Sequence, residues 1–417
     1  MDIREFSEHF NLTAEQRDFV IKYGYNEVAD RLNDVPGSLN ESSIRREADK
    51  LHSKLDVENL LAAADEIIND RYSLAFYNFT CYYWWERKET MLYGNKLPLW
   101  EQRPVTADRV GIYNLLAALA GFQVVERSYA QLGLPPEVAQ DTIQYITGAV
   151  QEYAAGHDGK CGVAWNKLQW MRFYVDGKLF RIGRFEYLIH RLPEWCPLIF
   201  RNDDGVIAVL AAPRMKFDAN GLVTLKDEFV VSTIEEDGPF ITGIPCTVEG
   251  IARVNETLTI DRREFRSVFS PWDIVPSIHI PGGLRMSWED AVASMKEAKE
   301  FFKRYLKREI PAIVCGSWIL NPALERFAPK GNMARFRKEV FCVPMIRWGD
   351  KGRDGMFFAF GRDDVPPTEI EPVNSLQKAL QEVYKAEGTL RTGAMFVLTE
   401  DLEKLGNMYY RTQQKVL

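Results

Sequence analysis

Residues 277–290 read SIHIPGGLRMSWED, and this stretch decides how the C-terminal half of the chain folds. The run Ser277–Ile280 is short and mostly β-favouring, so it predicts a β-strand. Pro281 ends that strand, because proline cannot donate to the ladder of a central strand. The next two residues, Gly282 and Gly283, permit a tight turn that another backbone or a ligand can approach closely. The stretch therefore predicts a strand that runs into a glycine loop.

A helix is expected directly after this loop. Ser287 and Asp290 form the S-x-x-[DE] pattern that caps a helix N-terminus. Apolar residues then recur at helical spacing, namely Trp288, Ala291, Val292, Met295, Ala298, Phe302, Tyr305 and Leu306. Lysine and glutamate occupy the opposite side, so the pattern predicts an amphipathic helix packed on a sheet.

A glycine loop that opens a helix leaves backbone N–H groups free at the positive end of the helix dipole. Such a place suits a phosphate or pyrophosphate, although the same geometry also serves as an ordinary turn. No Walker lysine follows the glycines, and the chain has no G-x-G-x-x-G. Nucleotide hydrolysis and a Rossmann dinucleotide site are therefore poor interpretations, while the anion site and the plain turn both stay open.

The composition is that of a globular protein with more than one core. A chain of 417 residues favours two or three domains, and its shares of 46% hydrophobic and 27% charged residues are ordinary. The net charge of -7 argues against nucleic acid as the main ligand, because there is no basic excess to neutralise phosphates. No apolar segment is long enough to span a bilayer, so no membrane association is expected.

The ends and the cysteines favour a cytoplasmic protein. The charged start at Met1–Glu5 is followed by no apolar run of the kind found in signal peptides. The six cysteines are scattered without any C-x-x-C pair, which predicts reduced thiols, no zinc site and no compact disulfide framework. No metal is therefore expected.

The first part of the chain reads as helical and the rest as strands mixed with helices. Thr13 and Gln16 form a capping box, and Pro135-Pro136 opens a helix that runs to Gly156. Strand-sized apolar runs follow at residues 179–188, 206–211, 229–233, 258–260 and 274–280. The first of these runs switches its alternation at Gly183, which predicts a β-bulge there. We expect a helical N-terminal domain over 1–158 and a second domain over 159–417.

Further elements follow the helix that ends at Leu306. Residues 312–315 predict a second strand, and Asn321 with Pro322 predicts an N-capped short helix. Residues 340–346 and 356–360 predict a strand pair, Asn374 caps another helix, and residues 393–398 predict the last strand. The charge run at 261–264 is interpreted as a solvated helix start. The fold class predicted is α+β, with a mixed sheet flanked by helices.

The order strand, loop, helix, strand, short helix, strand, strand resembles the core of GNAT-type acyltransferases. The chain more specifically resembles a bacterial family of N-acyltransferases with a helical N-terminal domain and a GNAT-like C-terminal domain. The segments that carry this resemblance are 180–186 (FRIGRFE), 277–281 (SIHIP), 317–324 (SWILNPAL) and 332–336 (NMARF). Such a family member is expected to hold acyl-CoA or acetyl-CoA as co-substrate, with the pyrophosphate at the helix N-terminus, and to acylate a small-molecule amine.

One departure bears on that expectation. Standard GNAT enzymes carry a Q/R-x-x-G-x-G/A loop, and residues 280–285 (IPGGLR) do not match it. The alternative to an acyltransferase is therefore a catalytically inactive GNAT-like module that binds a ligand or a protein. The oligomeric state and the acyl length do not follow from the sequence.

Direct acyl transfer needs a base for the amine and donors for the oxyanion. His279 lies on the strand expected to line the cofactor cleft and is the candidate base; a buried, hydrogen-bonded histidine is the structural alternative. Ser317 is the second catalytic candidate, or else a turn hydroxyl. Arg184 and Glu186 are expected on one strand face, either contacting the acceptor or forming an ion pair.

The cofactor-binding candidates are the loop residues Gly282, Gly283, Leu284 and Arg285, together with Asn321. Arg285 could pair with a phosphate or be a solvated charge at the helix start. Asn321 is expected mainly to cap its helix and could in addition contact the cofactor. The aromatic run 82–85 (YYWW) suggests a stacking platform at first sight, but on a helix it more often belongs to the core.

Overall fold

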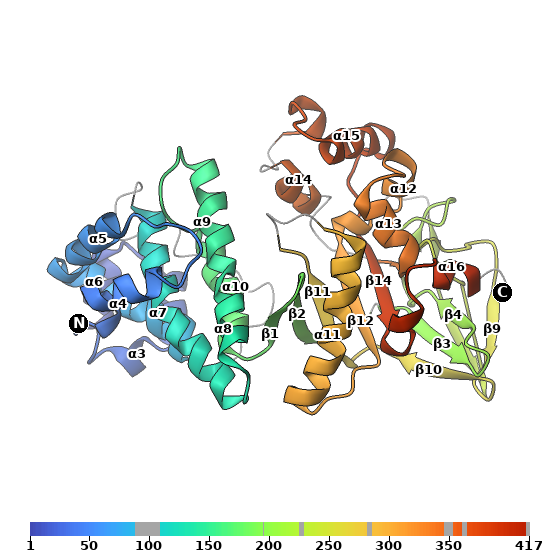
Figure 1. Ribbon diagram of the computed structural model, residues 1–417, viewed down its shortest axis with the longest axis horizontal. Helices are drawn as coiled ribbons and strands as arrows, with labels where there is room; N and C mark the ends of the chain where they lie inside the picture. The colour runs from blue at the N-terminus through green and yellow to red at the C-terminus, as the bar shows by residue number, and fades with distance from the viewer. Residues whose placement is uncertain are drawn as a thin grey trace. The chain divides into compact units, whose positions relative to one another are not determined.

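The computed structural model describes residues 1–87, 109–194, 196–224, 229–281, 286–345, 353–360 and 365–413. The chain divides into two compact units, Met1–Arg181 and Ile182–Leu417. The first unit carries the helices coloured blue to green in Figure 1, and the second carries the sheets together with the orange and red helices. The division confirms the expected α+β architecture, and it falls later in the chain than the predicted boundary at 158/159.

The first unit is all-helical over its described residues up to strand β1. Its α-helices are α1 (Ile3–His9), α2 (Ala14–Lys22), α3 (Tyr25–Val28), α4 (Glu41–Ala48), α5 (Val57–Asn69), α6 (Arg71–Cys81), α7 (Val110–Gln131), α8 (Pro136–Ile143), α9 (Tyr145–Gly156) and α10 (Trp165–Val175). The capping box at α2 is confirmed, because the Thr13 hydroxyl accepts from the Gln16 N–H and the Gln16 side chain accepts from the Thr13 N–H. No helix in the described parts of the chain combines the length and apolar character that a membrane crossing requires.

An aromatic core holds this unit together. Tyr82, Tyr83, Trp84 and Trp85 form a π-helical turn, and all four are buried. Their burial confirms the core interpretation of this run and excludes an exposed stacking platform. Burying an aromatic side chain removes a large apolar area from water, so these residues contribute strongly to stability.

A six-stranded mixed sheet is the centre of the second unit. Its order is β1-β2-β11-β12-β14-β13, and β1 (Leu179–Ile182) spans the division between the units. The other strands are β2 (Phe185–Arg191), β11 (Ile274–His279), β12 (Ala312–Ser317), β14 (Gly393–Leu398) and β13 (Phe341–Pro344). Neighbours pair antiparallel in β2–β11, β12–β14 and β14–β13, whereas the central strands β11 and β12 run parallel. The last strand predicted, 393–398, is confirmed as β14.

Helix α11 (Trp288–Leu306) covers one face of this sheet, as its amphipathic pattern predicted. The Ser294 hydroxyl of α11 donates to the Ile182 carbonyl at 2.6 Å and lies 2.9 Å from the Tyr187 hydroxyl of β2. Tyr187 also packs its ring edge-on against Phe302. The face of the sheet that carries Tyr187 is therefore the α11 face.

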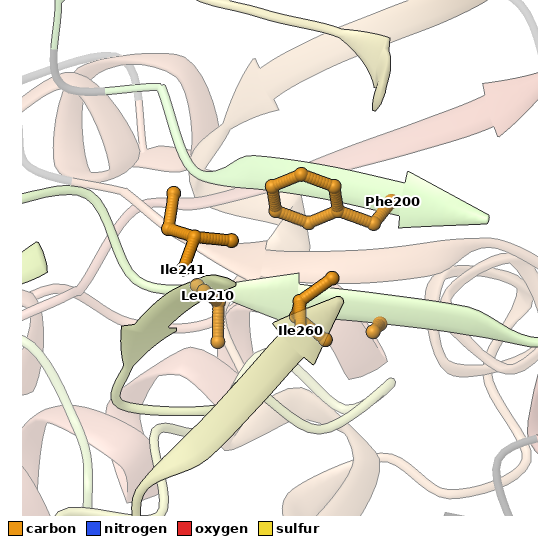
Figure 2. Close-up of a cluster of buried hydrophobic side chains, with 5 residues drawn as sticks. Phe200, Leu210, Ile241 and Ile260 are labelled. Carbon is orange, nitrogen blue, oxygen red and sulfur yellow. The ribbon is translucent and has the colours of Figure 1, made fainter. Parts of the chain in front are cut away.

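A smaller β-module lies between β2 and β11 in the sequence. It contains the sheet β10-β3-β4 and the sheet β7-β8-β9, built from β3 (Leu198–Asn202), β4 (Ile207–Leu210), β7 (Ile234–Asp237), β8 (Phe240–Gly243), β9 (Leu258–Asp261) and β10 (Phe265–Phe269); β5 (Lys216–Phe217) pairs with β6 (Val230–Val231). Side chains of Phe200, Leu210, Ile241 and Ile260 converge between these strands (Figure 2) and form its core together with Ala208.

The predicted bulge at Gly183 is wrong. Strand β1 ends at Ile182, Gly183 and Arg184 form a two-residue turn, and β2 begins at Phe185. Gly183 takes a φ of 56°, which suits the first central position of a tight hairpin. The chain reverses there, so the switch in alternation marks a turn and not an extra residue. Arg184 consequently lies in the turn and not on a strand face shared with Glu186.

Two further predictions are corrected. Residues 356–360 are helical, within α14 (Arg353–Phe360), because Met356, Ala359 and Phe360 have helical spacing and pack against a helix-lined cluster with Leu380. The run 261–264 is the end of β9 at Asp261 and a turn over 262–264 that leads into β10, and the Asp261 carboxylate accepts from the Arg263 N–H at 2.9 Å.

The remaining elements are the 3₁₀ helix η3 (Trp318–Leu320), α12 (Leu324–Phe327), α13 (Asn332–Glu339), the 3₁₀ helix η4 (Pro367–Glu369), α15 (Ser375–Glu387), the 3₁₀ helix η5 (Thr399–Lys404) and α16 (Tyr409–Gln413). Of these, the short helix α12 and the helix α15 were predicted. Asn374 caps α15 as predicted, because its side chain accepts from the Gln377 N–H at 2.9 Å.

Candidate functional site

The candidate site is built where the two parallel strands of the large sheet end. Ser277 of β11 lies beside Val314 of β12, and no further register pair joins these strands within their described residues. By contrast, β11 pairs with β2 from Ile274 to His279 without interruption. Backbone groups of β11 and β12 beyond Ser277 are consequently not consumed by pairing between the two strands. This edge can therefore offer main-chain hydrogen bonds to a bound molecule.

His279 is the last residue of β11 and lies directly opposite Glu186 of β2. Residues directly opposite in an antiparallel pair project to the same face, with Cβ atoms about 5 Å apart. The adjacent pair is Ile278 and Tyr187, and Tyr187 faces α11. His279 and Glu186 therefore share the face opposite α11.

Burial differs sharply along this polar pair. Glu186 is 2% exposed and Arg184 in the preceding turn is 8% exposed, whereas His279 is half-buried. Ser277, on the same face as His279, is also buried. The structure thus brings His279 and Glu186 together, and it places Arg184 next to them along the chain. Contact of Arg184 or Glu186 with an acceptor stays a prediction.

Ser317 closes β12 at the same edge of the sheet, because parallel strands end on the same side. It is the N-terminal cap of η3, and its hydroxyl oxygen accepts from the Ile319 N–H at 3.4 Å. An acceptor role of the oxygen leaves the hydroxyl hydrogen able to donate elsewhere. The turn role expected for Ser317 is present, and it is compatible with a donor role toward a ligand.

Asn321 is fully buried at the end of η3. Its side-chain oxygen accepts from the Ala323 N–H at 3.0 Å, two residues on, while α12 begins only at Leu324. The interaction is an Asx-type turn that precedes the helix, so the predicted helix start is two residues too early. A contact between Asn321 and a cofactor stays a prediction.

The cofactor loop residues Gly282, Gly283, Leu284 and Arg285 lie outside the described residues. On either side of them, β11 ends at His279, one residue before its predicted end, and Ser287 caps α11 as predicted by accepting from the Asp290 N–H at 3.0 Å. The Asn332 side chain supports this entry by donating to the Met286 carbonyl at 2.6 Å.

The sequence pattern does not reveal how closely Met345 approaches Gly316. This residue lies on β12 between Cys315 and Ser317, on the face shared with Val314, and it is exposed. A side chain there would come within 2.6 Å of the Met345 sulfur. Its partner on β14 is Ala394, so two residues with little or no side chain lie next to each other at this end of the sheet. The pairing of β12 with β14 is needed to see this.

Cys315 lies one residue before Gly316 and projects to the other face. Burial, aided by nearby Cys342, raises the pKa of the Cys315 thiol to about 12. A thiol with such a pKa stays protonated at neutral pH and is a poor nucleophile. Within the described residues, no group of three or more His, Cys, Asp or Glu side chains is arranged to hold a metal ion.

The sheet order and the parallel central pair define the class of the protein. Strand β11 leads into the covering helix α11, and the chain returns in β12, which runs parallel to β11. The last strand, β14, then lies between β12 and β13. This is the arrangement of a GNAT-like domain. The family model described as the GNAT-like C-terminal domain matches residues 179–396. The chain belongs to this family.

Solved structures share this architecture over almost the whole chain. One is an acyltransferase in complex with decanoyl-CoA and teicoplanin, 16% identical, with a TM-score of 0.61, covering 96% of this chain and 100% of its own. Another is an acyltransferase mutant in complex with octanoyl-CoA, also 16% identical with a TM-score of 0.61, covering 95% of this chain and 99% of its own. At this identity the likeness establishes the fold. No curated protein matches the chain.

Proposed function

We propose that the protein is an acyltransferase that moves an acyl group from acyl-CoA directly to an amine of a small-molecule acceptor. The observation that carries this proposal is the end of the parallel pair β11–β12, where His279 and Ser317 are the last residues of their strands and project to opposite faces of the sheet.

The reaction would proceed without a covalent enzyme intermediate. His279 takes a proton from the acceptor amine, whose nitrogen attacks the thioester carbonyl carbon. Backbone N–H groups at the ends of β11 and β12 stabilise the oxyanion, and the Ser317 hydroxyl, which by alternation lies on the face opposite His279, reaches it from the other side of the sheet. The carbon–sulfur bond then breaks, and the CoA sulfur receives the proton from His279. The raised pKa of Cys315 supports direct transfer, since it makes this buried thiol of β12 a poor acyl carrier.

Two observations support acyl-CoA as the co-substrate. The structures with the same fold include complexes with octanoyl-CoA and decanoyl-CoA. In addition, Ser287 caps the N-terminus of the 19-residue helix α11, and its positive dipole end suits a pyrophosphate held by the loop Gly282–Arg285.

The acceptor class is proposed from the reaction and from one comparison. A protein of the same fold is bound to decanoyl-CoA together with teicoplanin. We therefore expect a small molecule with a free amine, and teicoplanin is the first compound to try.

Binding is tested by the melting temperature of the second unit with CoA, acetyl-CoA, octanoyl-CoA or decanoyl-CoA. A ligand at 100 times its dissociation constant stabilises a protein by about 2.7 kcal/mol, which is readily measured. Gly283→Phe should abolish the shift, while Gly148→Ala, in α9 with open space around it, should not. If no thioester or CoA raises the melting temperature at saturation, the proposal is wrong.

Turnover separates the enzyme from its alternative. Release of CoA thiol is followed with a panel of amines, and His279→Ala should lower the rate at least 100-fold while the thermal shift with CoA persists. The non-standard loop sequence at 280–285 favours the alternative of a GNAT-like module that binds without reacting. Strong binding with no turnover for any acceptor would support that module.

A further inference from the structure

We propose that Glu186 is the positioning residue of His279, so that the two form a carboxylate–imidazole pair at the end of β11. The catalytic meaning of the pair rests on the proposed function, but the pair itself is tested in the protein without any ligand.

The strand register places the two residues together. Six successive pairs join β11 to β2, from Ile274 opposite Arg191 to His279 opposite Glu186, so the register at the last pair is not a chance contact. Because both side chains project to the same face from Cβ atoms about 5 Å apart, the carboxylate can reach the imidazole ring. Their shared face is opposite the one that α11 covers.

The burial of Glu186 means that its carboxylate needs a partner. Glu186 is 2% exposed, and an ionised carboxylate at such a position needs a partner that carries positive charge or donates hydrogen bonds. His279 is only half-buried, so it keeps some access to solvent. The carboxylate is therefore the inner member of the pair and the imidazole the outer, reactive member.

The chemistry of the pair suits a general base. A carboxylate that accepts from one ring nitrogen fixes the tautomer, so the other nitrogen carries the lone pair that receives the proton. The imidazolium that forms when the amine proton arrives is stabilised by the same carboxylate, which stays ionised throughout. The proton leaves again with the CoA thiol, so the pair returns to its starting state.

Other charged groups near the pair define the competing arrangement. Arg184 lies in the turn before β2, two residues before Glu186, and it is buried as well. It can therefore also pair with the Glu186 carboxylate. From β12, the residues on the same face are Val314 and Gly316, and neither is titratable. On β11 the same face carries Ser277. The α11 side contributes Glu297, on the opposite face of the sheet beside Gly183.

The test is an NMR pH titration of the histidine ring protons in the full-length protein. The chain has only five histidines, and the spectrum of His279→Gln assigns the signal of His279. In the wild type, His279 should titrate above the ordinary value of about 6.5 and show one dominant neutral tautomer. In Glu186→Gln its pKa should fall by about one unit or more. Glu297→Gln is the matched control and should leave it unchanged, as should the signal of His190 in every variant.

The outcomes are distinct. A His279 pKa that does not move in Glu186→Gln overturns the proposal, and assigns the carboxylate to Arg184. If Glu186→Gln fails to fold, the pKa of His279 is measured in Glu186→Asp, and the tautomer of His279 is measured in the wild type. A wild-type His279 pKa below 6.5 together with mixed tautomers overturns the pair. Where turnover is found, Glu186→Gln should lower kcat and leave the KM for acyl-CoA unchanged. The pH at which the rate increases should shift to a lower value. Stabilisation by CoA is unaffected by the pair, so failure of the pair and failure of the proposed function are separate results.

Discussion

Gly393 has no room for a side chain, because a Cβ atom there would come within 2.8 Å of the carbonyl carbon of Leu320. The obstacle is backbone, which cannot rotate away as a flexible side chain can. Gly393 also lies opposite Ser317 on β12 and Pro344 on β13. A single missing methyl group therefore lets η3 lie against β14 and so determines where Ser317 is held.

Gly393→Ala should lower the free energy of unfolding by about 1 to 3 kcal/mol, since the chain must shift to admit the new methyl group. Because the shift falls on η3, acyl transfer should decline more than CoA binding does. Urea unfolding and the thiol-release assay measure the two effects. Gly148→Ala is the control: its site in α9 is open, and it should stabilise slightly. Equal stability of Gly393→Ala and the wild type would contradict this account.

At the scale of elements, a buried arginine joins the small β-module to the segment after β14. Arg201 of β3 is 4% exposed and forks onto the fully buried Asp401, with Nη2–Oδ1 and Nη1–Oδ2 distances of 2.9 and 3.0 Å. It also donates to Glu400 at 2.5 Å, and Arg266 of β10 reaches the same carboxylate at 3.0 Å. Two strands of the module are thereby tied to η5.

The Glu400 contacts predict a pH-dependent stability. Burial acts to raise the pKa of Glu400, but the charges and hydrogen bonds of Arg201 and Arg266 outweigh it and hold this pKa below the ordinary 4.5. A carboxyl with a depressed folded-state pKa stabilises the fold above its unfolded pKa and loses that contribution as the pH falls through the folded value.

Glu400→Gln should therefore cost roughly 0.5 to 1 kcal/mol at pH 7, a small figure because the carboxylate is half-exposed. The difference from the wild type should shrink below pH 4.5 and vanish at still lower pH. Urea titrations at several pH values measure it, with the more exposed Glu403→Gln of the same η5 helix as control. A difference that grows on acidification would refute the assignment.

At the scale of the whole molecule, each unit has a core of its own. Phe79 is fully buried in the helical unit, and Phe302, on the buried side of α11, is fully buried in the second unit. Units with separate cores commonly unfold as separate cooperative transitions. The ligand loop and the sheet edge both belong to the second unit, so a bound thioester should stabilise that unit.

Calorimetry should accordingly resolve two transitions. Phe79→Ala should lower one of them and Phe302→Ala the other, each by the 3 to 5 kcal/mol or so that an aromatic cavity costs. CoA should raise only the transition that Phe302→Ala lowers. One transition that responds to both substitutions would show that the units unfold together.

The sequence determined those features that depend on neighbouring residues. The Ser287 cap, the amphipathic run of α11, the Asn374 cap and the order of elements around β11 and β12 all follow from local spacing, and all are present. The GNAT-like architecture was accessible for the same reason, since the order of short elements along the chain reflects the order of the sheet's parts.

Only the tertiary structure decided features that depend on distant segments. A change of alternation at Gly183 fits a bulge and a hairpin equally well, and the partner strand decides between them. The run 356–360 has a composition that suits either strand or helix, and packing near Leu380 favours the helix. His279 was a candidate by type, but its position opposite Glu186 depends on the register of β11 against β2. Register is set by the packing of both sheet faces, which no local pattern contains.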